Sequence, residues 1–92
     1  MSNKDLQSGS KLKLSPTQRA LLLNIQGGCE LMWSYKEHCF WRYDGKWTVK
    51  VLKSAADGLF KHDLIAYKAT GRHEGIRVER YKLTELGKSI TL

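Results

Sequence analysis

Hydrophobic side chains recur at every second position between residues 29 and 47, and this pattern restricts the fold more than any other part of the chain. Six of the nine aromatic residues lie in this segment, with the polar residues 36–38 in its middle. A period of two is typical of β-strands, and a polar break between two such runs indicates a hairpin. We therefore predict an aromatic β-ribbon. The predicted cross-strand pairs are Tyr35 with Cys39, Trp33 with Trp41 and Leu31 with Tyr43.

Helical patterns flank the ribbon on both sides. Ser15 suits an N-cap, Pro16 the first helical position and Gln18 a capping box, so a helix is expected over residues 16–26. From Thr48 to Leu59 apolar residues recur at steps of three and four, which predicts a second helix with lysines on its outer face. A helix over residues 30–37 is the competing interpretation of the ribbon's first half.

The last third of the chain predicts a second hairpin. Two strand-like runs, residues 64–70 and 76–83, surround a loop at residues 71–75 that has glycine at both ends. Thr84 and Glu85 then suit the start of a short closing helical turn. A chain of 92 residues supports one hydrophobic core, so we expect a single α+β domain over residues 14–92.

The first 13 residues are polar and basic, and two interpretations of them stay open. They are expected to form a flexible basic arm, or a loose terminus without a role. No apolar run has the roughly 18 residues that a membrane span needs, and no secretory signal is recognisable. The expected location is therefore the reducing cytoplasm, where Cys29 and Cys39 stay thiols.

Catalytic and metal-binding patterns find little support in the sequence. There is no glycine-rich phosphate loop and no spacing of acidic residues and histidines that favours acid–base chemistry. His38 and Cys39 are adjacent, but neighbours on a strand point to opposite faces. The three histidines form no zinc-ligand pattern with the two cysteines. We predict neither enzyme activity, nor a cofactor, nor a metal site.

Three segments resemble the winged-helix superfamily of DNA-binding domains. Residues 48–65, TVKVLKSAADGLFKHDLI, look like its recognition helix and exit, residues 81–88, YKLTELGK, like the end of its wing, and residues 14–28, LSPTQRALLLNIQGG, like its opening helix. Asp63 departs from the pattern at a position where the family usually has glycine, but aspartate tolerates the left-handed conformation, so we expect the turn to be kept. The ribbon replaces the helix before the recognition helix.

The resemblance implies a winged-helix-like domain built from a helix, a β-ribbon, a recognition helix, a wing hairpin and a short C-terminal helical turn. It also implies binding to double-stranded DNA in a small transcriptional regulator. The minimal size of the chain fits a phage or another mobile element as its source.

The charge distribution indicates where such a partner would bind. Sixteen Lys and Arg against nine Asp and Glu give a net charge of +7, which favours a polyanionic partner. Beyond the arm, the excess lies between residues 46 and 82. The alternative without a binding role is that the lysines form a solvated helix face and the arginines an ordinary polar hairpin tip. The candidate contacts are Lys46, Thr48, Lys50, Lys53 and Ser54 on the predicted recognition helix; Arg72, His73 and Arg77 on the hairpin for the minor groove; and Lys68, Arg80 and Lys82 for flanking phosphates.

Three functional hypotheses follow, and duplex DNA recognition is the first. It requires the lysines of the second helix and the arginines of the hairpin to face the same side, and a homodimer would use the ribbon, the arm or the closing turn. The second is a winged-helix adaptor or inhibitor of a nucleic-acid enzyme that binds an acidic host protein. The third is single-stranded nucleic acid or RNA stacked on ribbon aromatics, with Phe40 as the candidate ring. Trp33, Trp41 and Trp47 are assigned to the core.

Overall fold

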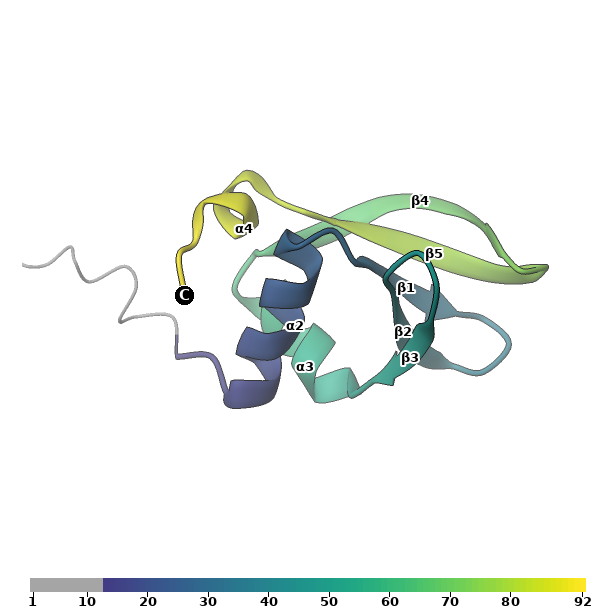
Figure 1. Ribbon diagram of the computed structural model, residues 1–92, viewed down its shortest axis with the longest axis horizontal. Helices are drawn as coiled ribbons and strands as arrows, with labels where there is room; N and C mark the ends of the chain where they lie inside the picture. Colours follow the sequence, from purple (N-terminus) through teal and green to yellow (C-terminus); the bar gives the residue numbers. More distant parts are fainter. Residues whose placement is uncertain (1–12) are drawn as a thin grey trace, which may run out of the picture.

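The computed structural model describes residues 13–92, so all of the predicted arm except Lys13 lies outside the described residues. This part of the chain forms an α+β domain with a five-stranded antiparallel sheet and three helices (Figure 1). The elements in chain order are α2 (Pro16–Gln26), β1 (Glu30–Ser34), β2 (Cys39–Tyr43), β3 (Thr48–Val51), α3 (Lys53–Lys61), β4 (Ile65–His73), β5 (Ile76–Leu83) and α4 (Glu85–Ser89).

The strand order in the sheet is β3-β2-β1-β5-β4, which places β1 in the centre and β3 and β4 at the two edges. Helix α3 connects the two edge strands, and it packs beside α2 at one end of the sheet (Figure 1). The long β4–β5 hairpin runs away from these helices to a tip at the far end of the molecule (Figure 1).

Helix α2 begins and ends where the sequence predicts. The Ser15 side chain accepts a hydrogen bond from the Gln18 backbone N–H at 3.2 Å, and the Gln18 side chain accepts one from the Ser15 N–H at 2.9 Å. This capping box satisfies two N–H groups that the first helical turn leaves unpaired. Leu21, Leu22 and Ile25 form its buried side.

The predicted ribbon is the β1–β2 hairpin, so the competing helical interpretation of residues 30–37 is wrong. The predicted register is also wrong, by one residue. The observed pairs are Ser34 with Cys39, Trp33 with Phe40, Met32 with Trp41, Leu31 with Arg42 and Glu30 with Tyr43. Because β1 is central and covered on both faces, Leu31 and Met32 are both fully buried, and alternation alone does not identify the register.

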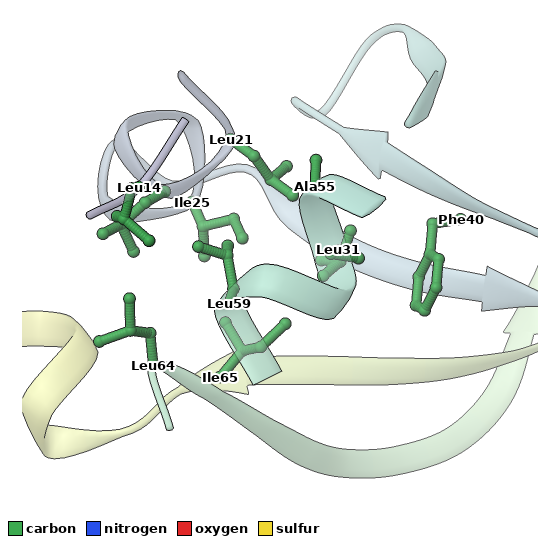
Figure 2. Close-up of a cluster of buried hydrophobic side chains, with 11 residues drawn as sticks. Leu14, Leu21, Ile25, Leu31, Phe40, Ala55, Leu59, Leu64 and Ile65 are labelled. Atoms are coloured by element: carbon green, nitrogen blue, oxygen red, sulfur yellow. The ribbon is translucent and has the colours of Figure 1, made fainter. Parts of the chain in front are cut away.

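Two hydrophobic clusters cover opposite faces of the sheet. We call the side on which α2 and α3 pack the helix face; Figure 2 shows Leu21 and Ile25 of α2 and Leu59 of α3 gathered over Leu31 of β1. The opposite side, here the second face, carries a smaller cluster. Its buried members are Met32, Trp41 and Val78, with Cys39, Tyr43 and Ile76 packed against them.

The predicted helix from Thr48 to Leu59 is only partly correct. Residues Thr48–Val51 form strand β3, and the helix starts at Lys53. The preceding turn is closed by Asp44, whose carboxylate accepts hydrogen bonds from the backbone N–H groups of Lys46 and Trp47, each at 2.8 Å. This turn directs the following residues back along β2, and the β-branched Val49 and Val51 suit a strand.

The second hairpin is confirmed, with the second strand as predicted, a first strand that extends to His73 and a correspondingly shorter turn. Glu74 and Gly75 alone connect β4 to β5, with φ angles of 52° and 83°. Two successive positive φ angles are typical of a type I′ turn, whose twist matches that of the strands. Asp63 takes the left-handed conformation expected there, with φ of 59°. Thr84 caps α4 by accepting a hydrogen bond from the Gly87 N–H at 3.0 Å, which confirms the closing turn.

Candidate nucleic-acid interface

The register of the sheet divides the predicted DNA contacts between its two faces. One cross-strand row runs from Arg80 on β5 through Met32 and Trp41 to Lys50 on β3, so these residues share the second face. Alternation along the strands places more predicted contacts there. The predicted contacts on this face are Thr48, Lys50, His73, Arg80 and Lys82.

Arg72 and Arg77 form a cross-strand pair on the opposite, helix face of the β4–β5 hairpin. Helix α3, with Lys53 and Ser54, lies on that same face. The prediction that Lys46, Thr48 and Lys50 lie on the recognition helix is wrong, since Lys46 lies in the β2–β3 turn and Thr48 and Lys50 lie on β3. Arg72, Arg77 and the α3 residues Lys53 and Ser54 are the predicted contacts on the helix face.

Hydrogen bonds and stacking hold the two hairpin arginines in place. The Arg77 guanidinium lies 4.7 Å from the centre of the Tyr35 ring, and Arg72 donates to the Gly75 carbonyl at 3.0 Å. Both arginines are exposed, and neither forms a salt bridge within the described chain. A preorganised, unpaired guanidinium loses little side-chain entropy when it meets a phosphate.

Glu79 lies beside these arginines and remains ionised at neutral pH. Its carboxylate accepts hydrogen bonds from the hydroxyl groups of Tyr35 and Tyr81, each at 2.5 Å. These two bonds, with the nearby Arg77 charge, hold the pKa of Glu79 below its ordinary value. Burial and the Glu79 carboxylate raise the pKa of Tyr81, and the same carboxylate raises the pKa of Tyr35. Glu79 thus orients the ring on which Arg77 stacks.

Helix α3 and the hairpin meet through aromatic side chains. Phe60 of α3 packs edge-on against Tyr81 of β5, with 5.1 Å between the ring centres. The exposed side of α3 carries Lys61 and also Lys53, which forms an ion pair with Asp57 at 2.8 Å. An exposed ion pair of this kind contributes at most about 1 kcal/mol, so a phosphate competes with it readily.

The side chains of His73 and Arg80 contact other residues of the domain and are not free to contact DNA. The His73 side chain is buried against Tyr43, with 4.5 Å between ring centres, and its Nε2 lies 3.2 Å from the Thr48 hydroxyl. Arg80 forms a salt bridge with Glu30 at 3.3 Å and donates to the backbone carbonyl of Arg72 at 2.7 Å. His73 joins the hairpin tip to β3, and Arg80 braces the hairpin from the second face.

Lys68 and Lys82 lie elsewhere, in a cleft on the second face. The cleft separates the base of the hairpin from the β2–β3 turn, and Lys88, Tyr43 and Asp44 also line it. Lys68 occupies a bulge, the point where the β4–β5 register shifts between Tyr67 and Ala69.

The tryptophans have different environments. Trp41 is buried and Trp33 packs against the main core, as predicted, but Trp47 is 64% exposed and its assignment to the core was wrong. Phe40 is buried under the helices and offers no surface for base stacking.

The sequence analysis missed Tyr35, which stacks on Arg77, because the meeting of these two residues depends on the pairing of β1 with β5 and has no local signal. Lys61 was expected on the lysine-bearing face of the second helix but was not among the predicted contacts.

Residues 13–92 contain no group of three or more potential metal ligands. Within the same range, no helix has the length and apolar character needed to cross a membrane. No protein-family model matches the sequence, and the comparisons with curated proteins and with solved structures found no match.

Proposed function

We propose that this protein binds double-stranded DNA through the helix face, with α3 and the β4–β5 hairpin as its two contact elements. The observation that carries the proposal is the position of Arg72 and Arg77. These outward-facing guanidinium groups, unpaired among the described residues, share a sheet face with α3. A helix beside a basic hairpin presents cations to two neighbouring grooves of a duplex.

Helix α3 and the hairpin make different kinds of contact with the duplex. Lys53 and Lys61 neutralise phosphates along the groove that α3 enters, and the Ser54 hydroxyl is the side chain suited to contact a base edge or a phosphate oxygen. The hairpin arginines follow the adjacent minor groove, whose negative potential attracts guanidinium groups. This mode of binding suits the small transcriptional regulator that the winged-helix resemblance implies.

The two faces of the sheet supply a matched test. The double variants R72E/R77E and K68E/K82E change the net charge by the same amount, on the helix face and in the cleft of the second face. Electrophoretic mobility shifts on random duplex DNA, single-stranded DNA and RNA would be compared for both variants and the wild type. R72E/R77E should weaken duplex binding at least tenfold more than K68E/K82E.

Other outcomes would contradict the proposal in distinct ways. Equal losses in both variants would indicate general electrostatic attraction without a defined face. A larger loss in K68E/K82E would move the interface to the cleft. Preference for single strands or RNA in the wild type would reject duplex DNA as the partner.

A further inference from the structure

Strand β3 has an open hydrogen-bonding edge. The Asp44 N–H donates to the Trp47 carbonyl at 3.3 Å, and bonded pairs alternate along an antiparallel ladder. The ladder bonds from β3 to β2 therefore belong to Val49 and Val51. The N–H and C=O groups of Thr48 and Lys50 point away from β2, and no turn, loop or cap bond in residues 13–92 uses them.

The other edge strand, β4, is protected in a way that β3 is not. β4 has a bulge at Lys68 and a row of exposed residues around it, features that discourage a further strand from pairing. β3 pairs with β2 without a register shift, and large apolar side chains are exposed on β3 and on the two residues that flank it. Their exposed fractions are 64% for Trp47, 41% for Val49 and 63% for Leu52.

The side chains beside this edge differ between the two faces. On the helix face, a groove separates β3 from α2; its apolar lining comprises Ala20, Leu21, Val49, Val51, Leu52 and Ala55. On the second face, β3 presents Thr48 and the exposed Lys50, and Lys46 lies in the turn just before it. A strand added to β3 would place alternate side chains in the groove and next to the lysines.

We propose that β3 binds an extended segment of a partner protein, as a sixth strand of the sheet, and that acidic residues alternate with apolar ones in this segment. Backbone hydrogen bonds to Thr48 and Lys50 supply affinity, the groove takes the apolar side chains, and the lysines take the acidic ones. Neither Arg72 nor Arg77 belongs to this edge, so the inference does not rest on the proposed DNA binding.

A second copy of this chain is a poor occupant of the same edge. Antiparallel pairing of two β3 strands would bring the Lys46 and Lys50 groups of both copies together, between chains that each carry a net charge of +7. Charge complementarity therefore favours an acidic partner.

The test uses three synthetic peptides and one backbone variant. The probe is a peptide of alternating glutamate and valine; the controls are the same peptide with lysine for glutamate, and with a central proline. Amide hydrogen exchange followed by NMR reads out each backbone group. The variant K50P removes an N–H that faces the open edge and leaves the bonds to β2 intact, a placement that proline tolerates in edge strands. K61E is a charge control away from β3, and circular dichroism verifies that both variants fold.

The expected results are specific to the edge. In the free protein the amides of Thr48 and Lys50 should exchange faster than those of Val49 and Val51. The glutamate peptide should slow them, and it should bind at least tenfold more tightly than either control peptide. K50P should lose at least tenfold in peptide affinity and keep its affinity for duplex DNA, whereas K61E should keep its peptide affinity.

Several results would overturn the inference. These are slow exchange of both amides in the free protein, equal binding of the glutamate and lysine peptides, or unchanged peptide binding by K50P. If K50P does not fold, the reversal K46E/K50E serves instead and should switch preference to the lysine peptide; a retained preference for glutamate is then the overturning result. Concentration-dependent dimers that K50P or K46E/K50E abolishes would identify a second copy as the occupant and reject the acidic partner.

Discussion

Neutralising both hairpin arginines should halve the salt dependence of DNA binding. On the helix face, the two proposed contact elements present four exposed cations to a duplex: Lys53 and Lys61 on α3, and Arg72 and Arg77 on the hairpin. Each neutralised phosphate contributes about −0.9 to the slope of log K against log salt, so the wild-type slope should be about −3.6 and the R72Q/R77Q slope about −1.8. Between 50 and 200 mM salt, the wild type should lose affinity about 150-fold and the variant about 12-fold.

Fluorescence anisotropy with a labelled duplex, titrated at four salt concentrations, measures this slope directly. The matched control is K68Q/K82Q, which removes the same charge from the second face and should leave the slope near the wild-type value. An unchanged slope in R72Q/R77Q together with a halved slope in the control would refute the assignment of the helix face. A wild-type slope near zero would refute electrostatic DNA binding altogether.

Three further predictions concern stability. A Cβ at Gly58 would lie 2.1 Å from the Gln18 side chain. The substitution G58A should therefore lower the free energy of unfolding by 0 to about 2 kcal/mol in the wild type, but raise it by about 1 kcal/mol in a Q18A background. Urea unfolding of the two single variants and the double variant measures this difference as a double-mutant cycle. H73A should lower the free energy of unfolding by about 2 to 3 kcal/mol in the same assay, because it removes the ring that packs on Tyr43 and leaves the Thr48 hydroxyl without its partner. H73F restores a ring at this position and should recover part of the lost stability. The Trp47 and Lys46 N–H groups hold the pKa of Asp44 below its ordinary value. Asp44 therefore stabilises the fold at neutral pH and loses this effect as the pH falls through the lowered pKa, so the difference in melting temperature between wild type and D44A should shrink on acidification.

Local chemistry made much of the fold predictable. The start of α2 follows from a serine, a proline and a glutamine whose spacing satisfies the first helical turn. The Asp63 turn and the Thr84 cap also depend on residues within a few positions of each other. These features are predictable because their causes lie within one turn of chain.

Features that depend on distant pairing were less predictable. The β1–β2 register was off by one because Leu31 and Met32 are buried on opposite faces, so both registers bury apolar side chains. The segment at residues 48–51 fits a helical pattern and a strand equally, and only the pairing with β2 makes it a strand. The same two errors affect the candidate site. A register shift of one residue, or a strand in place of a helical turn, places a lysine on the other side of the molecule.

The hydrogen bond between Thr48 and His73 joins the hairpin tip to β3, although four steps of the strand order separate β3 from β4. This hydrogen bond connects the hairpin tip to the opposite edge strand, so a displacement of either one would strain it. A strand bound at β3 and a duplex bound by the hairpin would both act on this hydrogen bond. Any effect of one ligand on the affinity of the other must be reciprocal.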